Sequence, residues 1–249
     1  MLQKGNLTIG TAVANQSGAM EAGTISKNER SLKSQMSKGN LLKMAVLYCF
    51  ILCICTPVYT QDCIDKAQNA LDKGGDLSEQ KKYSEAISYY KTAISHLKDC
   101  LNSTSYNKEL INEHIATVYS AIGSIYHNTK QHDQVIDALK QSIQYNSKDV
   151  KTYEDLGRAY VNLQQYDYAE EAFRNAIRIY PNSGIAHAQL GTIYFLQRED
   201  GNTALYFYEK ALTLSFRDDD YGRLVRIQAE GMSKRLKDEG YSSSRAKIR

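Results

Sequence analysis

The chain has 249 residues, of which 42% are hydrophobic, so it can bury a core and is not a wholly disordered protein. Its two prolines, Pro57 and Pro181, leave long stretches free of the residue that most strongly breaks helices. The net charge of +3 is uneven, because residues 1–60 hold six Lys/Arg against two Asp/Glu, while residues 61–249 hold 25 against 26. A nearly neutral folded part lacks the broad basic surface that binds phosphates, so we expect no nucleic-acid partner.

Two N-terminal segments precede the folded part. Residues 1–40 are rich in Gly, Ser, Asn and Lys and show no helical stripe, which predicts a disordered leader. Within residues 41–60, an apolar run of about 14 residues begins at Ala45, just after Lys38 and Lys43. The run is shorter than the roughly 20 residues of a membrane-spanning helix, but it fits the apolar region of a secretory signal peptide.

This apolar segment has two possible fates. Cleavage after Thr60 would release a periplasmic or extracellular protein, and this is the outcome we expect. Without cleavage, residues 41–60 would anchor the protein in a membrane and leave residues 1–43 in the cytoplasm. Either Met36 or Met44 could be the true start of the chain.

From residue 62 onward, apolar and small residues recur with a period of 34. Each copy shows two stripes at helical spacing, one for each helix of an antiparallel pair. The first-helix stripes are Ala70, Gly74 and Leu77; then Tyr119, Ile122, Gly123 and Tyr126; then Tyr153, Leu156, Gly157 and Tyr160; then His187, Leu190, Gly191 and Tyr194. The second-helix stripes are Ala86, Tyr90 and Ala93; then Val135, Leu139 and Ser142; then Ala169, Phe173 and Ala176; then Ala204, Tyr208 and Ala211.

The copy that ends at Pro181 resembles the consensus of the tetratricopeptide-repeat (TPR) family at each of these positions. The resemblance covers residues 62–216, in copies at about 62–100, 116–149, 150–183 and 184–217. It implies an all-α fold, a right-handed superhelical stack of helix pairs (an α-solenoid) with a concave groove. Residue pattern alone leads most of the way there, since an amphipathic helix pair buries its apolar faces only by stacking on its neighbours.

Three features depart from a regular repeat. A segment at residues 101–115 separates the first copy from the second, and a long helix over residues 107–128 is expected after it. Residues 218–239 are expected to form a helix that caps the stack, since a run of aspartates there suits a helix N-terminus. Residues 240–249 are expected to form a flexible tail.

Cys63 and Cys100 are the only cysteines outside the leader. The first helix pair should turn near Lys81 and Lys82, midway between the two cysteines, so antiparallel pairing sets them opposite each other. We therefore predict a disulfide between them, while two unrelated buried thiols remain the alternative.

The sequence offers little for catalysis. It has no glycine-rich phosphate loop, no HExxH, no paired CxxC and no nucleophile elbow, so we expect neither an enzyme nor a cofactor. His127, His132 and Asp133 could in principle bind a metal, but they flank an expected turn and a plain surface role is favoured. His187 occupies a packing position and is expected to be a partly buried core residue.

A partner-binding surface is expected on the side of the first helices that faces away from the packing stripes. It would be polar in the second copy and apolar in the fourth, with its centre near Arg158. That gradient suits a peptide with a polar end and a hydrophobic anchor. Alternatively, Glu154 and Arg158 pair with each other at i, i+4 and bind nothing. The predicted partner-binding residues are Ser124, Asn128, Lys151, Glu154, Arg158, Asn162, Thr192 and Phe195.

The sequence therefore predicts an exported or membrane-anchored scaffold or adaptor that holds a protein or peptide in its groove. A carbohydrate-binding or cell-wall-binding module on the same fold is the alternative, because the chain is rich in tyrosine. A carboxylate clamp for chaperone tails is disfavoured, since only one of the three regular repeats offers cations at the equivalent positions. The partner and the oligomeric state do not follow from the sequence.

Overall fold

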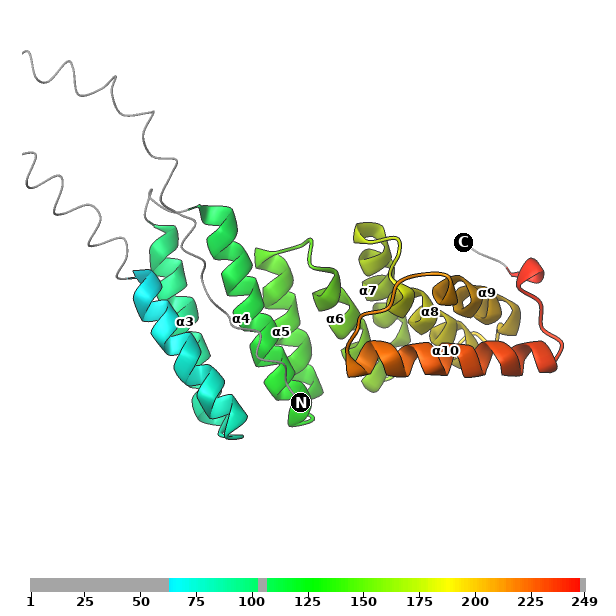
Figure 1. Cartoon of the computed structure of the whole chain (residues 1–249), viewed down its shortest axis with the longest axis horizontal. Coiled ribbons are helices and arrows are strands. Elements are labelled where there is room, and N and C mark those ends of the chain that lie inside the picture. The colour runs from blue at the N-terminus through cyan, green and yellow to red at the C-terminus, as the bar shows by residue number, and fades with distance from the viewer. Residues whose placement is uncertain (1–62, 103–106, 247–249) are drawn as a thin grey trace, which may run out of the picture. The chain divides into compact units, whose positions relative to one another are not determined.

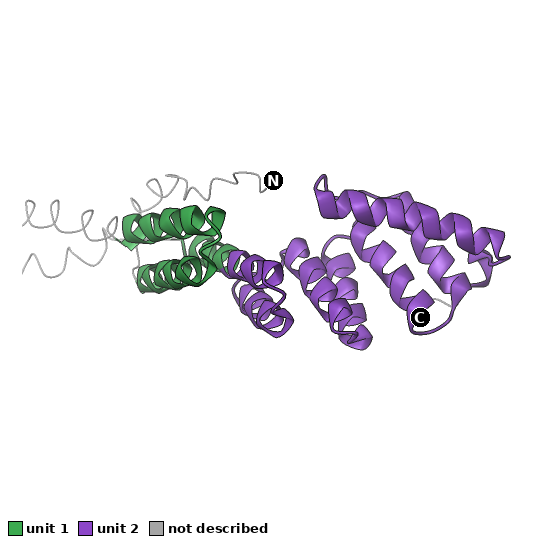
Figure 2. Cartoon of the chain, turned by 90° about the horizontal axis from the view of Figure 1, so that it is seen from below, with its two compact units in different colours: residues 1–118 green, residues 119–249 purple. Residues whose placement is uncertain are grey.

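The computed structural model describes residues 63–102 and 107–246, and the regular elements within these ranges are helices (Figure 1). The expected all-α fold is thus confirmed for the described residues. The chain divides into two compact units, Met1–Val118 (unit 1) and Tyr119–Arg249 (unit 2) (Figure 2). The predicted leader at 1–40 and the predicted signal peptide or anchor at 41–60 lie outside the described residues.

Unit 1 contains a helix over residues 63–79, then α3 (Tyr83–Leu101) and the first part of α4 (Lys108–Asn128). The helix pair can pack closely because Gly74 has no side chain, and a Cβ there would lie 2.7 Å from the ring of Tyr90. Asn107 caps the N-terminus of α4, since its side-chain oxygen accepts hydrogen bonds from the backbone N–H groups of Glu109 and Leu110 at 2.9 and 3.3 Å.

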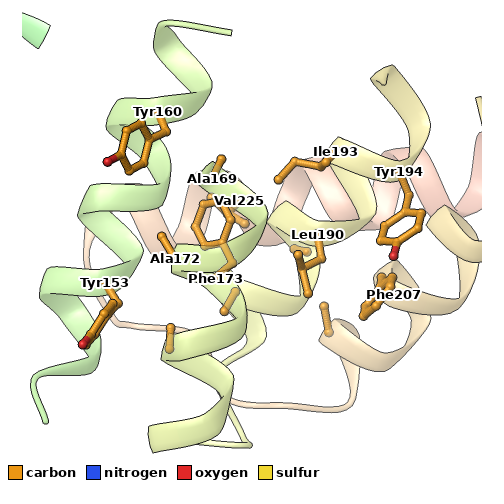
Figure 3. Packing of buried hydrophobic residues seen from close by; sticks show 14 of the residues in the cluster. Tyr153, Tyr160, Ala169, Ala172, Phe173, Leu190, Ile193, Tyr194, Phe207 and Val225 are labelled. Atoms are coloured by element: carbon orange, nitrogen blue, oxygen red, sulfur yellow. The ribbon is translucent and has the colours of Figure 1, made fainter. Parts of the chain in front are cut away.

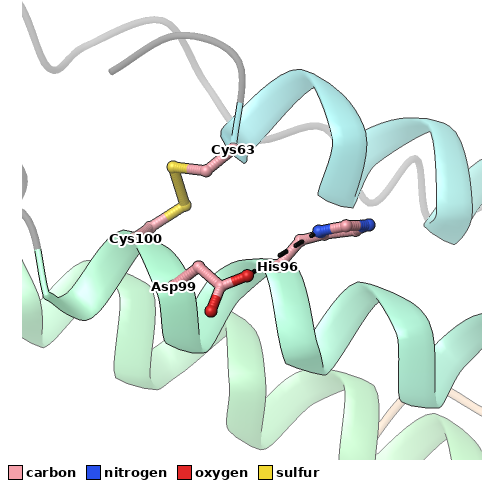
Figure 4. The surroundings of a disulfide bond; sticks show 4 residues. All are labelled: Cys63, His96, Asp99 and Cys100. Carbon is pink, nitrogen blue, oxygen red and sulfur yellow. Dashed lines mark ion pairs between the residues drawn. A yellow bond between two sulfur atoms is a disulfide. The ribbon is translucent and has the colours of Figure 1, made fainter. Parts of the chain in front are cut away.

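A disulfide joins Cys63, in the helix over residues 63–79, to Cys100, in the last turn of α3 (Figure 4). Their Cα atoms are 5.8 Å apart, within the range that a disulfide needs. Cys100 is fully buried, and an ion pair between His96 and Asp99 lies on the same stretch of α3. The bond closes the open end of the helix pair, opposite the turn that holds Lys81.

In its described residues, 119–246, unit 2 continues from the end of α4 through six further α-helices and one short 3₁₀ helix. Four of the α-helices begin with a residue whose side chain accepts a backbone N–H bond, at Asp149, Ser183, Asp200 and Asp219. The elements are α5 (His132–Tyr145), α6 (Val150–Asn162), α7 (Tyr166–Ile179), α8 (Gly184–Leu196), α9 (Gly201–Leu212), α10 (Asp220–Asp238) and η1 (Ser243–Arg245).

The core of unit 2 forms where a large residue of a second helix fills the space above a glycine of the first. A Cβ on Gly157 would lie 2.6 Å from the ring of Phe173, and one on Gly191 would lie 3.1 Å from the ring of Tyr208. Phe173 and Tyr208 are almost completely buried. Figure 3 shows this core, with side chains contributed by neighbouring helices of the stack.

The turns between paired helices share a backbone feature that the sequence did not reveal. Lys81, Lys130, Gln164 and Glu199 all adopt positive φ angles, between 50° and 60°, although none is glycine. Each lies just before the second helix of its pair. The turn residues of the regular repeats follow the sequence period, with 34 residues from Lys130 to Gln164 and 35 from Gln164 to Glu199 because of one extra residue after Arg198. Lys81 and Lys130 are 49 residues apart because the segment at residues 101–115 lies between them.

The C-terminal part packs against α8 and α9. Val225, Ala229 and Leu236 of α10 are buried. The start of the tail that was predicted to be flexible contacts α9, because Tyr241 lies over Gly201 and the backbone N–H of Ser242 donates to Asn202 Oδ1 at 2.9 Å. Among the described residues, no helix has both the length and the apolar character needed to cross a membrane.

Candidate functional site

The predicted partner-binding residues occupy equivalent positions on the first helices α4, α6 and α8, and the structure separates these positions into two kinds. Ser120, Glu154 and Ala188 mark a position that faces the following repeat. The Ser120 hydroxyl contacts Thr152 Oγ1 at 3.1 Å, and Glu154 and Ala188 are 3% and 1% exposed. Glu154 was expected on the surface that faces away from the core, and this expectation is wrong because Glu154 is buried.

A second position, at Ser124, Arg158 and Thr192, is more accessible. Ser124 is exposed, and its hydroxyl donates to the backbone oxygen of Ser120 at 3.1 Å. Thr192 is half-buried, and its hydroxyl contacts Tyr208 Oη at 3.0 Å. This position therefore presents small polar groups on α4 and α8, and a cation on α6.

The last residues of the three first helices form an exposed column. Asn128 ends α4, Asn162 ends α6 and Leu196 ends α8, and all three are exposed. The predicted apolar member was Phe195, which is half-buried with its ring 5.7 Å from the guanidinium of Arg235 on α10. The exposed apolar residue at this end is Leu196, with 54% of its surface accessible.

Glu154 lies at the centre of a buried polar cluster. The Ser183 hydroxyl donates to Glu154 Oε1 at 2.6 Å, and Arg217 Nη1 lies 3.2 Å from Oε2. Burial raises the pKa of Glu154, although the bond from Ser183 and the charge of Arg217 both act in the opposite direction. Arg217 also approaches Asp155 and Asp219, so it holds the α9–α10 loop against α6.

Arg158 faces the first turn of α10 instead of open solvent. Its guanidinium lies 4.4 Å from the ring centre of Tyr221, and Nη2 lies 3.4 Å from Asp155 Oδ1. Arg217 approaches the same ring at 5.5 Å, and burial raises the pKa of the Tyr221 hydroxyl. Glu154 and Arg158 do not pair with each other, as the alternative had them. Glu154 pairs with Arg217, and Arg158 pairs with Asp155.

The α9–α10 loop is fixed by backbone hydrogen bonds to the α7–α8 turn. Gly184 N donates to Ser215 O at 2.7 Å, and Ser215 N donates to Asn182 O at 3.2 Å. Gly184 also leaves room for Phe216, because a Cβ on this glycine would lie 2.7 Å from the Phe216 ring. These contacts place Phe216 and Arg217 beside the start of α6.

A pocket of about 500 Å³ opens at this place. Its walls combine apolar side chains with charged groups, and two of the predicted partner-binding residues, Lys151 and Glu154, line it. Its lining residues are Lys148, Asp149, Val150, Lys151, Glu154, Tyr180, Ser183, Ile185, Ser215, Phe216 and Arg217. We call it the α6 pocket.

A second, smaller pocket of about 310 Å³ lies among α5, α6 and α7. Tyr160 and Tyr168 stack in it with ring centres 5.3 Å apart, and Tyr168 is 59% exposed. Asp133 and Asp137 are among its lining residues. We call it the α7 pocket.

No group of His, Cys, Asp and Glu in the described ranges, 63–102 and 107–246, could hold a metal ion. His187 is 8% exposed, and its Nδ1 donates to the backbone oxygen of Ser183 at 2.8 Å. Burial lowers the pKa of His187, as expected for a core histidine.

Two family models described as tetratricopeptide repeat match residues 116–149 and 150–183. The chain contains tetratricopeptide repeats at residues 116–183. A third family model, described as Est1 DNA/RNA binding domain, matches residues 169–220. That segment of the TPR protein holds five Lys/Arg against eight Asp/Glu, a balance that does not favour contacts to phosphates. The expected absence of a nucleic-acid partner stays a prediction.

Solved structures of other TPR proteins resemble this one. A tetratricopeptide repeat protein from Parabacteroides merdae is 15% identical, with 70% of this chain and 65% of that chain covered and a TM-score of 0.53. The TPR domain of Arabidopsis OM64 is 19% identical over 53% of this chain and 98% of its own, with a TM-score of 0.43. The TPR2B domain of yeast Sti1, solved as a pHsp70 complex, is 18% identical over 50% and 97%, with a TM-score of 0.43. At these identities the Parabacteroides structure shows the fold alone. No curated protein matches the TPR chain in sequence.

Sequence reasoning missed two residues that approach α6, Arg217 from the α9–α10 loop and Tyr221 from the first turn of α10. Arg217 and Tyr221 lie more than 50 residues from Glu154 and Arg158 in the sequence, and no periodic pattern pairs them. One signal was present. Glu154 is equivalent to Ala188, and a small apolar residue at that position indicates burial in every repeat.

Proposed function

We propose that the repeat domain is a protein-interaction scaffold that holds a peptide segment of a partner across its first helices. The α6 pocket carries this proposal. Two predicted partner-binding residues, Lys151 and Glu154, line this cavity, which is of a size that accepts a side chain. We assign the pocket to an apolar side chain of the partner.

The charged residues around the α6 pocket determine which partner residues can lie beside the apolar side chain that enters it. Asp149 is engaged in capping α6, and Glu154 is engaged by Arg217, so neither carboxylate is available to a partner. Lys148 and Lys151 are exposed at the rim. The partner should therefore carry an Asp, a Glu or a terminal carboxylate beside its apolar anchor, since a charge-assisted hydrogen bond to a lysine adds to the burial of the anchor.

Export is the second part of the proposal. The apolar run within residues 41–60 supports a signal peptide, and a disulfide such as Cys63–Cys100 is typical of proteins in oxidising compartments. N-terminal sequencing of the protein from its own cells tests this. A mature chain that begins near residue 61 and is found outside the cytosol is expected, whereas a chain in the cytosol that keeps residues 1–43 would exclude export.

The binding proposal is tested with a peptide array that varies one apolar residue and its acidic neighbours. Peptides with an acidic residue beside a Leu or Phe should bind best. Lys151→Glu should weaken the best binder about tenfold or more, as expected for a lost charge-assisted hydrogen bond. Lys91→Glu, an equal charge change at an exposed position on α3 in unit 1, is the control and should leave the affinity unchanged. Equal losses in the two variants would show a general charge effect and remove the α6 pocket from the proposal.

The alternative function, carbohydrate or cell-wall binding, is supported by the α7 pocket. The exposed ring of Tyr168 could stack on a sugar, with Asp133 and Asp137 as hydrogen-bond acceptors. A glycan array with Tyr168→Ala separates the two functions. Glycan binding that disappears in this variant would favour the alternative, and peptide binding that survives it would favour the scaffold.

A further inference from the structure

The last helix, α10, occupies the place of a first helix in a fourth repeat of unit 2. Its buried Val225 and Ala229 follow the pattern set by Leu190 and Tyr194 on α8, displaced by 35 residues. In each earlier repeat a second helix follows and covers the first. After α10 the chain turns at Gly240 and forms only the short η1, so no second helix covers α10 in the described residues.

The uncovered side of α10 carries an apolar stripe. Leu224 and Ile227 are 63% and 66% exposed, and a Cβ placed on Gly231 would meet nothing within 4 Å. These residues are spaced i, i+3 and i+7, so they lie on one helical face. The equivalent residues on α8 are Gln189, which is buried, Thr192, which is half-buried, and Leu196, which is exposed.

This α10 stripe suits a second helix that lies antiparallel to it. A glycine on an exposed helix face lets another helix approach closely, while Leu224 and Ile227 supply apolar surface to bury. The stripe would cost solubility if it stayed uncovered, and the flanking charges indicate what covers it.

The charges at the two ends of the stripe are complementary to each other. Asp220 and Lys234 lie on opposite sides of Ile227, each seven residues away, and both are exposed. In an antiparallel pair of identical helices centred on Ile227, Asp220 of each copy faces Lys234 of the other. Asp220 also pairs with Arg223 of its own helix at 2.6 Å, but its side chain remains 89% exposed and can reach a partner.

We propose that α10 pairs with α10 of a second copy of this chain, antiparallel and centred on Ile227. The two-fold symmetry places Leu224 of one copy near Gly231 of the other, so a large residue meets an open position twice. The pairing covers the exposed face of α10. It leaves the α6 pocket open to the protein whose peptide segment it is proposed to bind.

Sedimentation velocity of the purified full chain over a concentration series tests the pairing. The expected result is a reversible monomer–dimer equilibrium that Ile227→Asp shifts at least tenfold toward monomer. Leu196→Asp, the same kind of change at an exposed apolar position on α8, is the matched control and should leave the equilibrium unchanged. Ile227 is exposed in the monomer, so circular dichroism and the melting temperature at low protein concentration should not change. A monomer at all concentrations, or a dimer that is insensitive to Ile227→Asp, would overturn the proposal.

The geometry of the pair is tested by charge exchange. Asp220→Lys and Lys234→Asp should each weaken the dimer severalfold, because each places like charges opposite one another. The double variant exchanges both charges and should recover most of the wild-type affinity. A double variant that is no tighter than the weaker single variant would exclude the antiparallel arrangement.

Discussion

The first helix pair in unit 1 and the α6–α7 pair in unit 2 share one packing design but differ in what holds them. In both, a glycine of the first helix lies under a ring of the second, 16 residues later: Gly74 under Tyr90, and Gly157 under Phe173. The first pair lacks large aromatic residues on its first helix and closes its open end with a disulfide. The α6–α7 pair has Tyr153 on its first helix and no covalent link. A weak repeat is thus stabilised by a crosslink, and a regular one by aromatic burial.

Removal of the disulfide should produce the largest effect. The loop between Cys63 and Cys100 has a sequence separation of 37, and closing a loop of that length stabilises by about 4 kcal/mol in the chain-entropy model. We expect the Cys63→Ser/Cys100→Ser variant to lose hydrogen-exchange protection in residues 63–101 and to keep it in α6–α9. Equal loss in both regions would show that the bond stabilises the whole stack and not the weak pair.

The glycine positions should give the next largest effect. Gly157→Ala should destabilise by about 1–3 kcal/mol, because the new methyl group overlaps the Phe173 ring. Gly123→Ala is the matched control, since its nearest contact is 3.3 Å to Leu139 and the gain in helix propensity of about 1 kcal/mol offsets the crowding. Urea unfolding measures both variants. Similar losses of stability in the two variants would show that the close contact of Phe173 with Gly157 does not make this repeat more sensitive than the one that contains Gly123.

The buried carboxyl of Glu154 should give a smaller, pH-dependent effect in unit 2. Because burial raises its pKa in the folded protein, the folded state binds a proton more readily than the unfolded state. Its contribution is therefore largest below the ordinary value of 4.5 and is lost as the pH rises through the folded-state pKa. Relative to Glu154→Gln, the wild type should lose stability as the pH rises from 4.5 through the folded-state pKa of Glu154. A constant difference from pH 4 to pH 8 would contradict the raised pKa.

The smallest effect is expected at His187. Burial lowers its pKa, so the folded state disfavours the charged imidazolium. The contribution is present above the ordinary value of 6.5 and is lost as the pH falls through the folded-state pKa. His187→Asn can keep a donor to Ser183 O without titrating. It should make urea unfolding less sensitive to pH between 7 and 5, and an unchanged sensitivity would place the titration elsewhere.

The sequence predicted the elements that repeat and failed for contacts that do not. The spacing of Tyr153, Gly157 and Phe173 follows directly from helix geometry, so the helix pairs and their core were predictable. The surroundings of Arg158 were not, because they include Tyr221 of α10, and the loop before α10 is fixed by the Gly184–Ser215 hydrogen bond. Equivalence between repeats reveals buried positions, whereas contacts from a non-repeating end of the chain need the structure.

Site-resolved photo-cross-linking on the full-length protein in its own cells tests the central claim most directly. A photo-reactive residue is placed at Lys151, beside the α6 pocket, at Tyr168, beside the α7 pocket, and at Lys91, on unit 1. The scaffold proposal predicts that a protein partner is captured from position 151 alone, through a segment in which an acidic residue adjoins an apolar one. Capture from position 168 without capture from position 151, or of a glycan in place of a protein, would contradict it.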